Sequence, residues 1–119
     1  MRPAMEARRI RVLVVKDSAA AREFSGLIEH AGHAVEIATS VTEAVARLTH
    51  LAFDVAILDR ELRGEDTAPV RTRLERDGIP YVASSRMQAE YVDGAGVRSQ
   101  FTPPFTAYRF LTLLRSIGD

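Results

Sequence analysis

Short apolar runs and amphipathic segments alternate along this chain. The apolar runs are rich in valine, isoleucine and alanine and predict β-strands, most of them buried on both faces. They cover residues 12–15, 34–38, 54–59, 79–85 and 97–102. In the segments between them, apolar residues recur every three or four positions, which is typical of amphipathic helices. The predicted helices cover residues 18–31, 40–51, 69–77 and 106–118, with a short and weak one at 86–96.

Residues typical of helix ends support these boundaries. Ser18 is a candidate N-cap for the first helix, and Gly32 follows its last apolar position. Pro69 suits the first turn of the third helix, and Gly78 ends it. Five strand–helix units in succession predict an α/β fold with a doubly wound, five-stranded parallel sheet covered by helices on both faces.

Composition narrows the class of protein. A chain of 119 residues corresponds to one domain, here residues 9–119 after an N-terminal extension at 1–8. Sixteen basic and sixteen acidic residues cancel, which disfavours nucleic acid or an anionic membrane as partner. The absence of cysteine suits a reducing cytosol, and no apolar run approaches a membrane span. We therefore expect a cytoplasmic protein.

Polar residues and prolines follow the predicted strands, where ligands bind in sheets of this type. These residues are Lys16, Asp17, Asp59, Glu61, Ser84, Ser85, Pro103 and Pro104. Paired carboxylates such as Asp17 and Asp59 suit Mg²⁺, which takes one or two protein carboxylates together with water and phosphate oxygens. A carboxylate beside such an ion can also attack a phosphoryl group and form an acyl phosphate.

Several sequence motifs together resemble the response-regulator receiver domain of two-component systems. The matching stretches are RVLVVKD, GHAVEIATSVTEAVARL, FDVAILDREL, GIPYVASS and FTPPF, and the resemblance covers residues 9–117. It is strongest to the stand-alone receivers, which carry no attached output domain. The resemblance implies phosphorelay signal transduction, in which the chain is a phosphoprotein rather than a conventional enzyme. Its chemistry would be limited to phosphotransfer onto itself and autodephosphorylation.

The resemblance also assigns roles to individual residues. Asp59 occupies the position that accepts phosphate from a histidine kinase, and Ser85 matches the hydroxyl residue that ends strand 4. Asp17 matches one of the acidic residues that hold Mg²⁺, and the backbone carbonyl of Glu61 would complete the metal site. The implied metal ligands are thus Asp17, Asp59 and Glu61.

Four positions depart from the family pattern. Lys16, the only lysine of the chain, stands where the family has an acid, and Pro103 stands where it has a lysine. Arg86 replaces a small residue, and Gln100 replaces the aromatic residue of the family's switch. The changes at positions 16 and 103 together leave the site with a formal charge of −1, compared with −2 in a usual receiver. We therefore expect weaker Mg²⁺ binding and impaired or altered phosphorylation.

Two functional hypotheses follow. In the leading hypothesis, the chain is a stand-alone response regulator in which a histidine kinase phosphorylates Asp59 in the presence of Mg²⁺; whether Lys16 or Arg86 replaces the missing strand-5 lysine is left open. In the second, it is a pseudo-receiver that docks proteins without phosphate. The surplus of apolar residues in the segment 105–117 favours an additional contact. We expect a homodimer or effector protein on the face formed by helix 4, strand 5 and helix 5. The Pro103–Pro104 bond is expected to be cis, as in the family.

Overall fold

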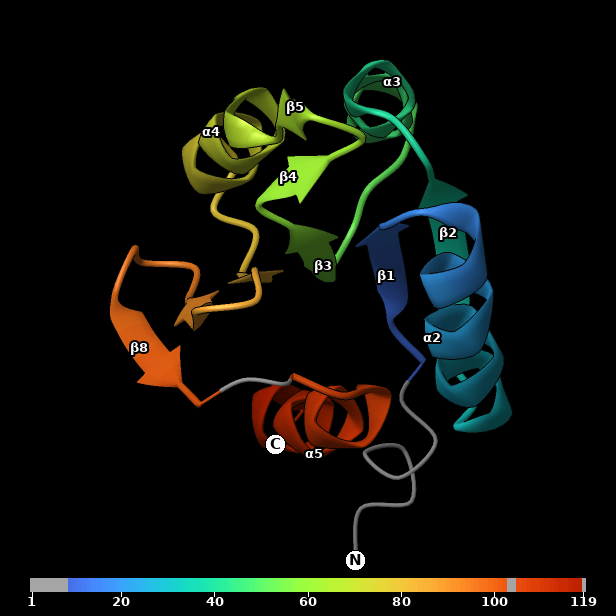
Figure 1. Cartoon of the computed structure of the whole chain (residues 1–119). Helices are drawn as coiled ribbons and strands as arrows, with labels where there is room; N and C mark the ends of the chain where they lie inside the picture. The colour runs from blue at the N-terminus through green and yellow to red at the C-terminus, as the bar shows by residue number, and fades with distance from the viewer. Residues whose placement is uncertain (1–8, 103–104, 119) are drawn as a thin grey trace, which may run out of the picture.

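A computed structural model describes residues 9–102 and 105–118 of the chain (Figure 1). The strands of the main sheet are β1 (Arg11–Val15), β2 (Ala34–Ala38), β3 (Val55–Asp59), β6 (Tyr81–Ser84), β7 (Ala89–Val92) and β8 (Arg98–Phe101). Two further short strands are β4 (Glu61–Leu62) and β5 (Glu65–Asp66). The helices are α2 (Ser18–His30), α3 (Val41–His50), α4 (Ala68–Arg76) and α5 (Ala107–Gly118).

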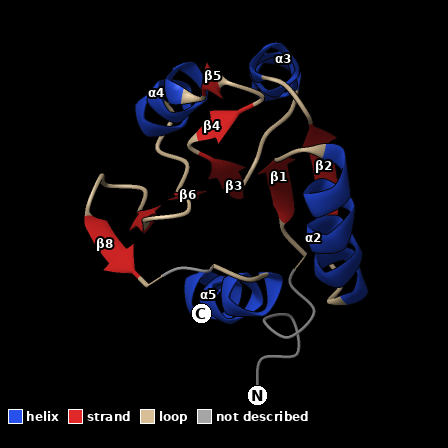
Figure 2. Ribbon diagram, in the orientation of Figure 1, coloured by secondary structure: helices blue, strands red, loops and turns tan. Residues whose placement is uncertain are grey.

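The main sheet lies between two layers of helices (Figures 1 and 2). Its strand order is β2-β1-β3-β6-β7-β8. Apolar residues of α3 and α4 pack against one face of the sheet, and those of α2 and α5 pack against the other. Every residue of β1 after Arg11, and every residue of β3 before Asp59, is buried. Helices cover both faces of the sheet at these central strands, which explains their continuous apolar runs.

The parallel pairing brings the ends of three strands to one edge of the sheet. Val15 of β1 lies opposite Leu58 of β3, and Asp59 lies opposite Ser84 of β6. The residues that follow β1, β3 and β6 are therefore neighbours, as the alternating pattern predicts.

The α/β fold class is confirmed, whereas the number and direction of the strands need a correction. Four strands, β2, β1, β3 and β6, are parallel, and β7 and β8 continue the sheet as an antiparallel hairpin. The predicted helix at 86–96 is wrong because this segment contains β7 and the turn after it. The predicted strand at 97–102 exists as β8, but it runs antiparallel to its neighbour.

The turn between β7 and β8 explains why this segment is not helical. The side chain of Asp93 accepts hydrogen bonds from the backbone N–H groups of Ala95 and Val97, both at 2.9 Å. Gly96 has a φ of +88°, a conformation that favours glycine. A Cβ on Gly94 would lie 3.0 Å from the carbonyl oxygen of Gly78, so a small residue lets the hairpin approach the start of the β6 segment.

Some sequence predictions fall outside the described residues. The N-terminal extension at 1–8 and the Pro103–Pro104 bond both lie there, and the division of the chain at residue 9 stays a prediction. Within residues 9–102 and 105–118, the structure contains no helix with the length and apolar character needed to cross a membrane.

Candidate functional site

An ion pair between Lys16 and Asp59 lies at the carboxyl ends of β1 and β3. The Lys16 Nζ atom is 2.7 Å from Asp59 Oδ1, and the two side chains are 6% and 29% exposed. The ammonium group also lies 4.7 Å from the ring centroid of Phe24 in α2. A buried ammonium group needs such compensation for its lost hydration, and the carboxylate and the aromatic ring both supply it. The single lysine is therefore part of the interior rather than a surface charge.

Asp17, the second candidate carboxylate, lies at the N-terminus of α2. Its Oδ1 atom accepts a hydrogen bond from the backbone N–H of Ala20 at 3.1 Å, and the residue is exposed. Asp17 is therefore the N-cap, in place of the predicted Ser18, which is the first residue of the helix. A carboxylate at this position satisfies an unpaired N–H group and interacts favourably with the helix dipole.

Glu61 begins a small hairpin directly after the site. Strands β4 and β5 are joined by Arg63 and Gly64, whose φ angles are +54° and +80°. Two consecutive positive φ angles are typical of the type I′ turn that closes two-residue hairpins. The Glu61 side chain is exposed. The sequence analysis predicted neither a strand nor a helix between residues 60 and 68.

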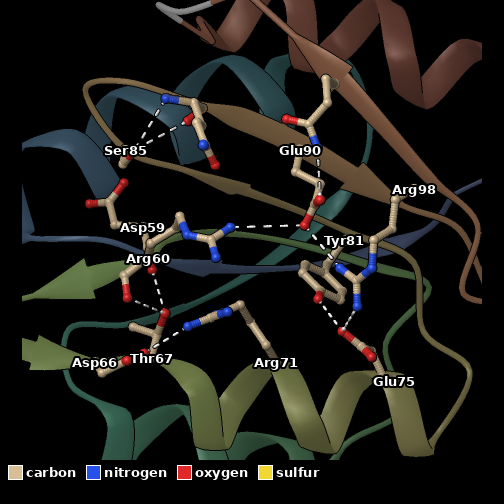
Figure 3. Close-up of polar contacts among 12 residues, drawn as sticks. Asp59, Arg60, Asp66, Thr67, Arg71, Glu75, Tyr81, Ser85, Glu90 and Arg98 are labelled. Atoms are coloured by element: carbon tan, nitrogen blue, oxygen red, sulfur yellow. Dashed lines mark hydrogen bonds and ion pairs between the residues drawn. The ribbon is translucent and has the colours of Figure 1, made fainter.

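Thr67 is a functional neighbour that the sequence analysis missed. This fully buried residue lies directly before α4, and its Oγ1 atom is 2.6 Å from the Asp59 carbonyl oxygen and 2.9 Å from that of Arg60. Its backbone N–H also donates to Arg60 at 3.0 Å (Figure 3). These contacts hold the backbone of Asp59 and Arg60 in place, and thereby the position of the Asp59 carboxylate. The only sequence signal for Thr67 was its place just before the helix that begins near Pro69, which indicates a residue at a helix start and not one that supports the site.

Thr67→Val tests this support because valine keeps the volume and removes the hydroxyl group. We expect the free energy of unfolding to fall by about 1–3 kcal/mol, since the Asp59 and Arg60 carbonyl groups lose the one buried hydroxyl donor that they share, while Arg60 keeps the Thr67 N–H. Urea denaturation of the purified protein would measure it. Thr72→Val, at an exposed position of the same helix, is the matched control and should change little. Equal effects of the two variants would contradict the role of Thr67.

Ser85 follows β6 and stabilises its own turn. Its Oγ atom accepts hydrogen bonds from the backbone N–H groups of Met87 and Gln88, each at 3.2 Å. Its backbone N–H donates to the Gln88 carbonyl at 2.7 Å. Because Asp59 pairs with Ser84, the hydroxyl group lies at the same edge of the sheet as the ion pair (Figure 3). Arg86 is exposed in this turn.

The described side chains fit Mg²⁺ poorly. Asp59 Oδ1 already accepts from the Lys16 ammonium group, and Asp17 Oδ1 accepts from a backbone N–H. Among residues 9–102 and 105–118, no group of three or more histidine, cysteine, aspartate or glutamate side chains could hold a metal ion. A divalent cation at this edge would lie beside a fixed positive charge, which opposes its binding.

A network of charged and polar side chains connects the site to the hairpin (Figure 3). Arg60 lies 3.8 Å from Glu90 of β7, and Glu90 accepts from Arg98 of β8 at 2.9 Å. Arg98 also bonds Glu75 of α4 at 3.1 Å, and the Tyr81 hydroxyl donates to Glu75. The network holds the hairpin against α4 and reaches the residue after Asp59. Sequence reasoning missed it because its members are far apart in the chain.

The Tyr81–Glu75 hydrogen bond predicts a loss of stability at high pH. Burial, together with the Glu75 carboxylate, raises the pKa of Tyr81 to about 12, above the ordinary value of 10.0. The folded state therefore holds the Tyr81 proton more tightly than the unfolded state does. The contribution of this hydroxyl to stability is complete below pH 10 and is lost as the pH rises towards 12. The stability difference between wild type and Tyr81→Phe should shrink over this range. A pH series of urea unfolding would measure it, and a constant difference would contradict the assignment.

Comparisons with known proteins identify the fold. No protein-family model matches the sequence, and no curated protein matches it either. A response regulator receiver domain (CheY-like) from Methylobacillus flagellatus is 20% identical, covers 91% of this chain and 98% of its own, and has a TM-score of 0.68. A mutant of the anti-anti-sigma factor PhyR from Bartonella quintana is 20% identical over 96% of this chain, with a TM-score of 0.72.

A third neighbour is a fusion protein that carries the trimeric coiled-coil segment of yeast Spc42. It is 25% identical, covers 64% of this chain and has a TM-score of 0.58. The chain spans about half the length of this fusion (53%) and of PhyR (50%), but nearly all of the Methylobacillus domain. The likenesses to the Methylobacillus domain and to PhyR show that the chain has a receiver-like fold, in agreement with the resemblance found in the sequence.

The predicted docking face changes with the fold. It was expected to include the predicted helix at 86–96, the predicted strand at 97–102 and the last helix. The structure has β7 and the turn after it in place of that predicted helix. Strand β8 and helix α5 remain from that face, and Tyr108 of α5 is 72% exposed. Any partner that docks here would meet a sheet edge beside one helix.

Proposed function

We propose that this chain is a pseudo-receiver, a protein-docking module with a receiver-like fold that works without phosphate. One observation carries the proposal, namely the 2.7 Å contact between the buried Lys16 ammonium group and Asp59. The lysine supplies from within the chain the positive charge that a metal ion would otherwise bring to the carboxylate. The other sequence hypothesis, a phosphorylated regulator, is kept as the second candidate.

The strength of the ion pair is the physical reason. At 2.7 Å and an effective dielectric constant near 20, the attraction is roughly 6 kcal/mol before desolvation. Mg²⁺ would have to displace the ammonium group from Asp59 and leave it buried without its carboxylate, which is costly. We therefore expect weak Mg²⁺ binding and no phosphorylation, because both need the same carboxylate.

The second candidate rests on the position of the same lysine. A phosphoryl group on Asp59 would form within reach of the Lys16 Nζ atom, and the Asp59 side chain is 29% exposed. Lys16 could then neutralise phosphoryl oxygens in place of the family's strand-5 lysine, whose position is taken by Pro103. This reading requires phosphate transfer from a histidine kinase or a small phosphodonor.

Intact mass separates the two candidates. Wild type, Asp59→Asn and Lys16→Glu would be incubated with Mg²⁺ and a small phosphodonor or a panel of histidine kinases, beside an ordinary receiver. We expect no phosphoryl adduct on wild type, and a Mg²⁺-dependent rise in melting temperature only for Lys16→Glu. An adduct on wild type that is absent from Asp59→Asn would overturn the pseudo-receiver proposal and establish the second candidate.

Docking itself needs a separate measurement. We propose a histidine kinase or an effector protein of a two-component pathway as partner, because this is the partner class of receivers. Binding to such a protein should persist in the presence of a chelator and in Asp59→Asn, since neither metal nor phosphate takes part. Binding that depends on Mg²⁺ and phosphodonor would contradict the proposal.

A further inference from the structure

The edge of the sheet at β8 offers unpaired backbone groups to a partner. Strand β8 is the last strand in the sheet order, and among the described residues it pairs with β7 alone (Figure 1). Arg98, Ser99 and Gln100 are exposed, and Val97 just before them is 61% exposed. Edge strands of this kind are templates for pairing with another strand.

We propose that two copies of this chain associate through β8, which pairs antiparallel with itself about a two-fold axis at Ser99. The resulting sheet would be continuous across both copies. This contact does not depend on whether Asp59 is phosphorylated, because it involves neither Lys16 nor Asp59.

The hydrogen-bond pattern of the hairpin determines which groups are available. The Asp93 N–H donates to the Val97 carbonyl at 3.0 Å, so that pair is hydrogen-bonded across the hairpin. Hydrogen-bonded and non-bonded pairs alternate in an antiparallel ladder, and so the backbone groups of Arg98 and Gln100 point away from β7. An axis at Ser99 places Arg98 of one copy opposite Gln100 of the other, with both sets of groups facing each other.

Side-chain charge favours this register over the neighbouring one. Glu90 binds both Arg98, at 2.9 Å, and Gln100, at 2.8 Å, on one face of the hairpin. In the proposed register, Arg98 of the second copy approaches the Gln100–Glu90 pair, which is electrostatically complementary. An axis at Arg98 would instead place two arginines directly opposite each other, which is destabilising.

Apolar side chains on the other face are also matched. Val97 and Phe101 share this face because side chains alternate along a strand. Phe101 lines an apolar groove of about 390 Å³ together with Phe105 and with Leu113 and other residues of α5. The proposed register places the exposed Val97 of the second copy opposite Phe101, at this groove. The contact therefore removes an exposed valine from water in each copy.

Cysteine cross-linking tests the register directly, since the chain has no cysteine of its own. Two Ser99 residues would face each other with Cα atoms about 4.5 Å apart, which a disulfide can span. Ser99→Cys should therefore form a covalent dimer under mild oxidation. Val97→Cys is the matched control, because its two copies would lie about 13 Å apart along the paired strands. Equal cross-linking of both variants, or none in Ser99→Cys, would overturn the proposed register.

A proline substitution tests the backbone contact without cross-linking. Gln100→Pro removes an N–H group that points away from β7, so the hairpin keeps its own ladder. Gln100→Ala loses the same side-chain contact to Glu90 and keeps the N–H group. In sedimentation experiments over a dilution series, wild type and Gln100→Ala should form dimers, and Gln100→Pro should remain a monomer with unchanged circular dichroism. A monomeric wild type, or a dimeric Gln100→Pro, would overturn the proposal.

Discussion

Replacing Lys16 with methionine should lower the free energy of unfolding by about 2–3 kcal/mol, as measured by urea denaturation. Methionine fills similar space but leaves the Asp59 carboxylate without its cation, and breaking a buried ion pair typically costs about 3–5 kcal/mol. The 29% exposure of Asp59 lets water replace part of the lost interaction, so we place the effect at or below that range.

A double-mutant cycle distinguishes the ion pair from simple packing. The double variant Lys16→Met/Asp59→Ala should lose less unfolding free energy than the two single variants lose in sum. This is because in the double variant the Asp59 change removes a charge that has already lost its partner. Arg76→Met is the surface control: its pair with Asp77 is formed at 3.5 Å by a side chain that is 68% exposed. That change should cost about 1 kcal/mol or less. Additive losses at Lys16 and Asp59 would show that the contact contributes no coupling energy.

Phe110→Ala should have the largest effect on stability, a loss of about 3–5 kcal/mol. Phe110 is fully buried, and its ring centroid lies 6.5 Å from that of Phe24 and 6.4 Å from that of Phe105. It connects α5 to α2, so its removal leaves a cavity between the two helices. Chemical denaturation followed by circular dichroism would measure the loss.

Tyr108→Ala is the control for Phe110, because it removes an aromatic ring from the same helix at a position that is 72% exposed. We expect a change within about 0.5 kcal/mol. If the two variants lost the same stability, the packing of α5 against α2 would not contribute as the structure indicates. Phe24 also faces the Lys16 ammonium group, so the aromatic cluster supports the site as well as the helix.

The central part of the fold was predictable because its signals are local. The apolar runs of β1 and β3 are continuous, as expected for strands covered by helices on both faces. The hairpin of β7 and β8 was not predictable in this way. Only Ala89 and Val92 of β7 are buried, a spacing of three that resembles a helix more than an alternating strand. The contacts that fix it, such as Arg98 with Glu75, join distant parts of the chain.

The candidate site likewise contains features that the sequence could predict and features that it could not. The arrangement of strands placed Lys16 and Asp59 at one edge, and the structure brings them into contact. Sequence could not show that the Asp17 carboxylate caps α2, because a capping residue and a metal ligand use the same carboxylate. It also could not show that Thr67 supports the Asp59 backbone, since this depends on how the β4–β5 hairpin returns the chain.

The meander of β6, β7 and β8 has a consequence for the order in which the chain folds. These strands pair with their neighbours in sequence, whereas β1, β2 and β3 pair only after a helix has crossed between them. Closing short loops costs less chain entropy, and hairpins form in about 1–10 μs. The Lys16–Asp59 contact must instead join residues 43 positions apart. We therefore expect the C-terminal edge of the sheet to take shape early in folding, and the charged site to close late.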